Sequence, residues 1–114
     1  MSLRVHSNSQ GDETILELDG MITLGAGSLK LREELRSALS GAADTVILDC
    51  AAVELVDSSG LAEIMSAHVH AEKLGRRLVL RNPGWRLLTV LNATRLNTVL
   101  HIEALPQPQA APLQ

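Results

Sequence analysis

Aromatic residues are almost missing from this chain of 114 residues, which contains one Trp, no Tyr and no Phe. The hydrophobic core therefore has to be built from Leu, Ile, Val and Ala, within a hydrophobic content of 46%. A surface that stacks nucleic-acid bases on aromatic rings is excluded by the same shortage.

Cysteine, positive charge and long apolar runs are scarce as well. Cys50 is the only cysteine, so the chain can form neither an intramolecular disulfide nor a thiolate metal cluster. A net charge of −3 without a basic stripe argues against direct binding of nucleic acid. No apolar run approaches the ~20 residues that span a bilayer, and the N-terminus lacks a signal pattern. We therefore expect a cytoplasmic protein that does not insert into membranes.

Hydrophobic patterning predicts a single α/β domain. Expected strands lie at 3–6, 14–19, 45–50, 77–81 and 98–102, and expected helices at 28–40, from 57 to 75, and from 85 onward. Strand-helix-strand units of this size favour parallel pairing through right-handed crossovers, and the opening hairpin adds an antiparallel edge. The expectation is a mixed, mostly parallel sheet of four to five strands over residues 1–103. Residues 104–114 contain three prolines and are expected to form a disordered tail.

Turns and helix ends carry signals of their own. The polar run 8–12 predicts a hairpin turn, and residues 20–27, punctuated by glycine, predict a loop. Ser28 is the expected N-cap of the first helix. Trp85 is expected to anchor the third helix in the core, and the alternative is that an exposed edge of its ring contacts a partner. In the second helix, the spacing predicts an inner face formed by Leu61, Ile64, Met65, His68 and Leu74.

One stretch, residues 53–61, places an acid, two hydroxyls and a glycine between a buried strand and an amphipathic helix. Hydroxyls at a helix N-terminus lie beside free backbone N–H groups and the positive end of the helix dipole, so a phosphate is tolerated there. In a purely structural interpretation, Asp57 is an N-cap, Ser58 and Ser59 are first-turn residues, and Gly60 allows close packing. Physical chemistry alone favours this interpretation.

The sequence Asp57-Ser58-Ser59-Gly60-Leu61 resembles the phosphorylation motif of STAS-domain anti-sigma factor antagonists. The framework around it, at 46–49, 74–75, 78–80 and 90–96, follows the family spacing, so the resemblance covers roughly residues 3 to 103. It implies a STAS domain that is not an enzyme and needs no cofactor or metal. It also implies that an anti-sigma factor Ser/Thr kinase binds the unmodified protein and is released when it phosphorylates Ser58. A Ser/Thr phosphatase would reset this control of sigma-factor-dependent transcription.

The partner surface is expected at one end of the sheet, because the loop after the second strand and the start of the second helix both follow carboxyl ends of strands. Two departures from the family bear on it: Thr23 stands where many relatives have an aspartate, and a Pro-rich tail replaces a closing helix. The second departure favours a partner or a homodimer that covers exposed surface. The residues expected to contact the partner are Met21, Ile22, Thr23, Leu24, Asp57, Ser58, Ser59 and Gly60.

Two other kinds of function are open to this sequence. STAS domains also dock on the ATPase of ABC-type lipid transporters and serve as components of stress-sensing scaffolds, without need of phosphorylation at Ser58. A small enzyme that uses Asp57, Ser58 and a histidine would need an apolar pocket with convergent polar groups around Ser58.

Other candidate site residues carry weaker signals. His68 and Glu72 have i, i+4 spacing, but His70 points to another side of the helix, so no third metal ligand is evident. Cys50 ends a buried strand and is expected to behave as a small hydrophobe. The segment Gly25-Ala26-Gly27 lacks the further glycine and the acid of a dinucleotide-binding loop.

Overall fold

The computed structural model describes residues 2–103, which form an α/β domain. The expected tail at 104–114 lies outside the described residues, and its disorder stays a prediction. The elements in chain order are β1 (Leu3–Gln10), β2 (Glu13–Ile22), α1 (Ala26–Leu39), β3 (Thr45–Val56), α2 (Ser58–Lys73), β4 (Arg77–Arg81), α3 (Trp85–Ala93), the 3-10 helix η1 (Leu96–Thr98) and β5 (His101–Glu103).

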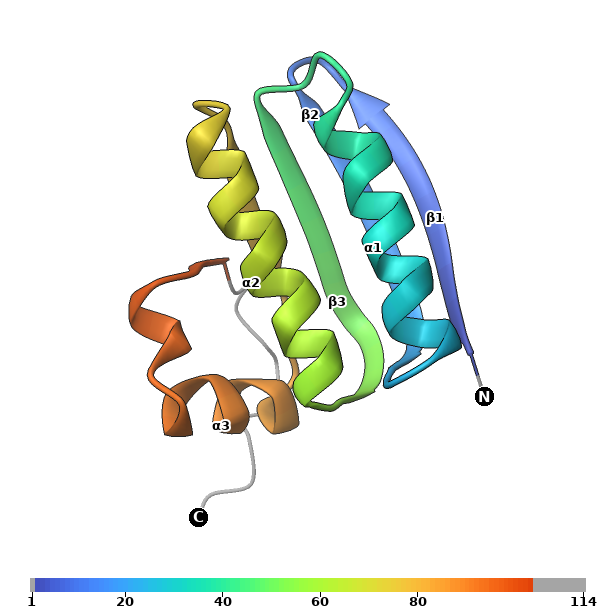
Figure 1. Ribbon diagram of the computed structural model, residues 1–114, viewed down its shortest axis with the longest axis vertical. Helices are drawn as coiled ribbons and strands as arrows, with labels where there is room; N and C mark the ends of the chain where they lie inside the picture. The colour runs from blue at the N-terminus through green and yellow to red at the C-terminus, as the bar shows by residue number, and fades with distance from the viewer. Residues whose placement is uncertain (1, 104–114) are drawn as a thin grey trace.

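The five strands form one mixed sheet in the order β1-β2-β3-β4-β5. The β1–β2 hairpin is antiparallel and all other pairs are parallel, which confirms the expected topology. Successive right-handed crossovers that always move to the next strand place their helices on the same face of a sheet. Figure 1 shows α1 and α2 side by side on one face, with α3 across the end where α2 begins.

The core lies between this face of the sheet and the two long helices. Alternate residues of the central strands, such as Leu16, Leu48 and Leu80, are fully buried against the helices. The helices contribute Leu31 and Ile64, among others, to the same cluster. The core contains no aromatic side chain among the described residues, as the composition predicts. Within residues 2–103, none of the helices combines the length and apolar character needed to cross a bilayer.

Several predicted boundaries are wrong because strands and the first helix extend beyond the residues that carry a clear hydrophobic pattern. The first strand continues through residues 8–10, and only Gly11 and Asp12 form the turn, with Gly11 at φ +59°. The loop expected at 20–27 shrinks to 23–25, since β2 runs to Ile22 and α1 starts at Ala26. Ser28 is not the N-cap: Gly25 holds that position, and the buried Ser28 hydroxyl donates to the Gly25 carbonyl.

The inner face of α2 also differs from the prediction. Ile64 and His68 are buried as expected, but Leu74 is exposed, and the remaining buried positions are Gly60, Ala67 and Ala71. Small residues at these positions leave room for α2 to lie close to the sheet and α1. Leu74 is the C-cap of the helix, where the chain already turns away toward β4.

Candidate functional site

Three loops meet at the carboxyl edge of the parallel strands: β2–α1, β3–α2 and β4–α3. This edge is where open α/β sheets present ligand and partner sites. The β2–α1 loop and the start of α2 are joined directly, because the Asp57 amide donates to the Ile22 carbonyl over 3.2 Å. The predicted proximity of these two segments is therefore confirmed.

Asp57 organises this edge through its carboxylate. Oδ1 accepts hydrogen bonds from the amides of Ser59 (3.0 Å) and Gly60 (3.1 Å), which is the geometry of an N-cap. Oδ2 accepts the amide of Leu24 at 2.9 Å, from a loop 33 positions earlier in the chain. One side chain thus caps α2 and fixes the β2–α1 loop against it.

These hydrogen bonds keep Asp57 ionised. The Ser59 hydroxyl, 2.6 Å from Oδ1, is the largest cause that lowers the pKa of Asp57 to about 2, and the Leu24 amide is the next. Donors that bind the charged form of a carboxyl favour that form. A fixed negative charge therefore stands beside Ser58 at neutral pH.

Gly60 lets α2 start directly over β2. A Cβ at Gly60 would overlap the Ile22 carbonyl oxygen and would lie 2.8 Å from Ile22 Cγ2 and 2.9 Å from Val56 Cγ1. No larger residue fits this position without movement of the helix or the strand. The glycine of the motif therefore has a packing reason.

The two serines of the motif have different surroundings. Ser59 is half-buried and its hydroxyl donates to Asp57. Ser58 is exposed, and within residues 2–103 its hydroxyl has no hydrogen-bond partner. Of these two serines, Ser58 is the one whose hydroxyl is exposed and makes no hydrogen bond within residues 2–103.

Comparison with known proteins identifies the family. The model for the family described as "Mlab, STAS domain" matches residues 5–104. The chain belongs to the STAS domain family. No curated protein sequence matches it.

Solved structures of similar fold include anti-sigma factor antagonists. A Thermotoga maritima protein described as a candidate anti-sigma factor antagonist is 19% identical, with a TM-score of 0.80 over 87% of this chain and 85% of that chain. Phosphorylated SpoIIAA, a Bacillus cell fate determinant, is 19% identical, with a TM-score of 0.71 over 91% and 93% of the two chains. Unphosphorylated SpoIIAA is 18% identical, with a TM-score of 0.68 over 91% and 89%. At these identities the likeness shows a shared fold.

The STAS domain presents only part of the expected partner surface to solvent. Leu24 is 82% exposed and Ser58 is exposed, whereas Met21 and Thr23 are half-buried. Ile22 and Gly60 are buried, so they support this surface from beneath and do not form it. That the remaining residues contact a partner stays a prediction.

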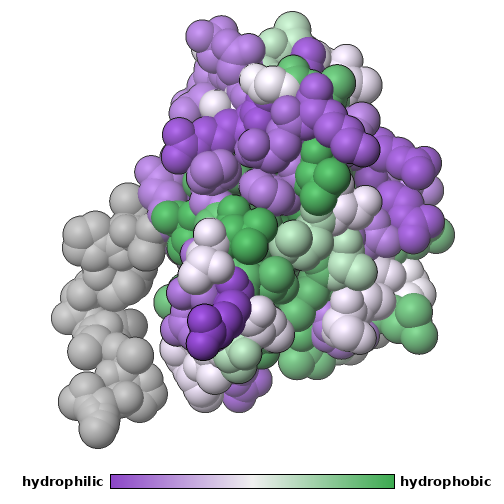
Figure 2. Space-filling model, turned by 60° about the vertical axis from the view of Figure 1, so that its left-hand side comes forward, coloured by the Kyte–Doolittle hydropathy of each residue, from purple (hydrophilic) through white to green (hydrophobic). Residues whose placement is uncertain are grey.

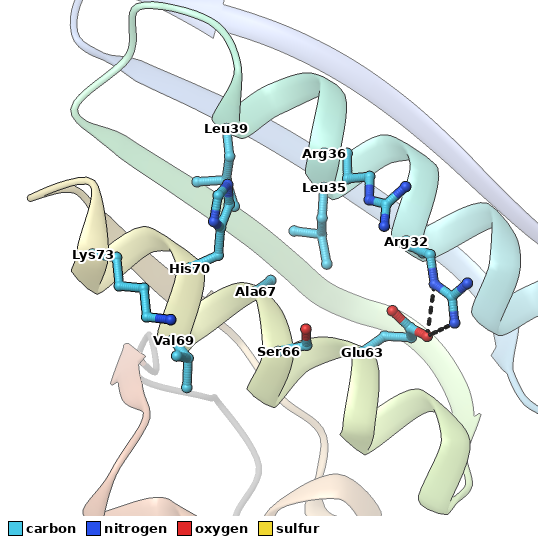
Figure 3. Close-up of a pocket in the computed structure, with 10 residues that line it drawn as sticks. All are labelled: Arg32, Leu35, Arg36, Leu39, Glu63, Ser66, Ala67, Val69, His70 and Lys73. Carbon is cyan, nitrogen blue, oxygen red and sulfur yellow. Dashed lines mark hydrogen bonds and ion pairs between the residues drawn. The ribbon is translucent and has the colours of Figure 1, made fainter.

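A groove with a volume of about 540 Å³ lies between α1 and α2, away from Ser58. Figure 3 shows the Arg32 side chain reaching across it to Glu63, and their closest contact is 2.7 Å. The Glu63 carboxylate raises the pKa of Arg32. The pocket that an enzyme built on Asp57 and Ser58 would need is therefore not this groove.

His68 and His101 lie apart from Ser58. His68 is ten residues further along α2, which is about 15 Å of helix. The His68 ring contacts the His101 ring, with 5.8 Å between the two centroids. The Glu72 carboxylate lies 3.6 Å from Nε2 of His101, so Glu72 approaches His101 and not His68 as its spacing suggested. No group of three or more metal-ligating side chains is assembled within residues 2–103. Burial raises the pKa of the Cys50 thiol to about 12, consistent with its expected role as a small hydrophobe.

At the same edge of the sheet, sequence reasoning offered an exposed Trp85 only as the alternative to a core anchor, and it missed Leu55. Trp85 is 55% exposed and does not anchor the core as expected, and Leu55 is 47% exposed. The sequence does carry a signal for Trp85, since it follows Pro83-Gly84 directly after a strand, which places it at the sheet edge. No pattern marks Leu55, because it sits inside an apolar strand.

Proposed function

We propose that this STAS domain is an anti-sigma factor antagonist. It binds an anti-sigma factor kinase while Ser58 is unmodified and is released when that kinase phosphorylates Ser58. The observation that carries the proposal is the exposed, unpartnered Ser58 hydroxyl beside the ionised Asp57. The domain performs no chemistry itself: it acts in the cytoplasm as a kinase substrate, and a phosphatase resets it.

The cap explains why a phosphate on Ser58 remains a free charge. A phosphate at a helix start is normally stabilised by the unpaired amides of the first turn. Here Asp57 already accepts from the amides of Ser59 and Gly60. The added charge of about −1.5 to −2 would therefore stay at the surface, next to a carboxylate of the same sign.

Such a charge opposes docking more strongly than it opposes folding. A partner that covers Ser58 has to desolvate the phosphate, and an uncompensated buried charge costs several kcal/mol. Each ~1.4 kcal/mol changes affinity tenfold. One modification can thus switch binding off while the domain stays folded.

The test uses the two neighbouring serines as a matched pair. Wild type, Ser58→Ala and Ser59→Ala are incubated with ATP and the anti-sigma factor kinase encoded near this protein, and intact mass is measured. Wild type and Ser59→Ala should each gain one phosphate, mapped to Ser58, and Ser58→Ala should gain none. Phosphate found on Ser59 alone would refute the assignment.

A second candidate is docking on the ATPase of an ABC-type transporter through the same surface. Thr23, half-buried in the β2–α1 loop where many antagonists have an aspartate, favours it. So does the description of the matched family, which is not that of an anti-sigma factor antagonist. Submicromolar binding to such an ATPase, unchanged by Ser58→Ala and without phosphate transfer, would select this candidate over the first.

A further inference from the structure

A small groove lies beside the Ser58 site. It has a volume of about 210 Å³ and is formed by the end of β3 and the start of α3. Apolar side chains line both walls: Val53, Leu55 and Val56 from β3, and Trp85, Leu87 and Val90 from α3. Figure 2 shows hydrophobic residues gathered over the lower half of this side of the molecule, at the height of α3 in Figure 1.

Two of these side chains are exposed to solvent. Trp85 is 55% exposed and Leu55 is 47% exposed. Burial of each would be favourable, at ~25 cal/mol per Å² of apolar surface. Trp and Arg are also the residues that most often dominate the affinity of protein interfaces. The start of α3 carries both, as Trp85 and Arg86.

The indole of Trp85 already contacts a neighbouring side chain in the free domain. The guanidinium carbon of Arg86 lies 5.5 Å from the centroid of the Trp85 ring, within the range of a cation–π contact. A side chain restricted by such a contact loses less conformational entropy on binding than an unrestricted one. Trp85 is therefore suited to act as an anchor.

One wall of the groove and Ser58 belong to the same short stretch of chain. Leu55 is three residues before Ser58 on the same stretch of chain. On the other side of Asp57, its Oδ2 holds the amide of Leu24, whose side chain is 82% exposed. Exposed apolar side chains thus flank the motif on both sides.

We infer that the partner docking over Ser58 also inserts an apolar side chain into the groove beside Trp85. This rests on the proposed function, since it names a second contact of the same partner. The groove suits an uncharged side chain, because its two charged lining residues, Glu54 and Arg86, carry opposite charges. The groove contributes to affinity whether or not Ser58 is phosphorylated. The phosphate determines whether the partner can dock over Ser58.

Binding of the anti-sigma factor kinase to the full chain, by titration calorimetry, tests the inference. Trp85→Ala should weaken binding by about 30-fold or more, as expected for an anchor residue. The loss should be equally large in a Ser58→Ala background. Asn92→Ala, at an exposed position of the same helix, is the control and should bind like wild type. Circular dichroism and thermal unfolding establish that each variant is folded.

A direct readout exists because Trp85 is the only tryptophan. In a chain labelled with 5-fluorotryptophan, the single fluorine resonance should shift when the unlabelled kinase is added. The inference is overturned if the resonance does not change and Trp85→Ala binds with wild-type affinity. If phosphorylation of Ser58 still blocks binding in that case, the proposed function stays intact. Loss of self-association in Trp85→Ala with normal kinase binding would assign the groove to a second copy and also overturn it. Absence of kinase binding to wild type overturns both.

Discussion

Gly60→Ala tests the close approach of α2 to β2, on which the position of Ser58 depends. The new methyl group would overlap the Ile22 carbonyl oxygen and lie within 2.9 Å of side chains from Ile22 and Val56. Since the Ile22 carbonyl oxygen at the end of β2 also accepts the Asp57 amide, it cannot move aside without loss of that bond, and the start of the helix has to shift. Overpacking of this kind costs typically 1–3 kcal/mol. Ala offsets about 1 kcal/mol of that through its better helix propensity.

The net expectation, from the upper end of that range, is a destabilisation of about 2 kcal/mol. In a domain of this size each kcal/mol lowers Tm by roughly 4–8 °C, so Tm should fall by roughly 8–16 °C in differential scanning calorimetry. Gly41→Ala is the control, because its Cβ would only touch the Ala38 carbonyl oxygen at 3.4 Å. It should leave Tm within a few degrees of wild type. A Tm for Gly60→Ala at or above that of wild type would refute the close contact of Gly60 with Ile22 and Val56.

Four further predictions concern the motif, its loop and the core. The folded-state pKa of Asp57, about 2, lies below the ordinary value of ~3.9, so the charged carboxylate stabilises the fold above about pH 4 and loses this effect as pH falls toward 2. Tm of wild type should therefore approach that of Asp57→Asn over this window, whereas parallel curves would contradict the linkage. Phosphorylated and unmodified protein should differ in Tm by only a few degrees, because the helix dipole and the Asp57 carboxylate act in opposite directions; loss of helical circular dichroism would show a switch that works by melting. Thr23→Arg should weaken partner binding about tenfold at unchanged Tm, since the Thr23 backbone carbonyl keeps its bond to the Ser28 amide; full affinity would remove the loop from the interface. Cys50, 1% exposed with its pKa raised to about 12, should resist iodoacetamide at pH 8 until the protein is unfolded, and rapid labelling of the native form would contradict its burial.

The sequence was sufficient to predict the type and order of the elements. A nearly continuous apolar run distinguished the strand at 45–50 from the helices on either side, which have one apolar stripe. The crossover rule then predicted the parallel sheet. The end of the second helix was predicted at Gly75 because glycine accepts a positive φ, and the observed φ of Gly75 is +71°. Strand ends were harder, because polar residues 8–10 pair in β1 although their side chains carry no β pattern.

The details of the site depend on contacts between distant residues. The bond from Leu24 to Asp57 joins positions 33 apart, and no local pattern encodes it. Ser58 was identified as the candidate phosphorylation site because the motif resembles that of a family. The hydrogen bond that distinguishes Ser59 from Ser58 forms only in the folded N-cap, where the Ser59 hydroxyl donates to Asp57. Trp85 was misplaced because hydrophobicity predicts burial on average and does not tell which apolar residue is left at an edge.

The affinity of the two phosphorylation states for the anti-sigma factor kinase is the most direct test of the proposed switch. Unmodified protein and protein phosphorylated at Ser58 are each titrated against the kinase by calorimetry at the same salt concentration. Desolvation of an uncompensated phosphate predicts that the phosphorylated form binds at least about 100-fold more weakly. Equal affinities for the two forms would contradict a switch at Ser58.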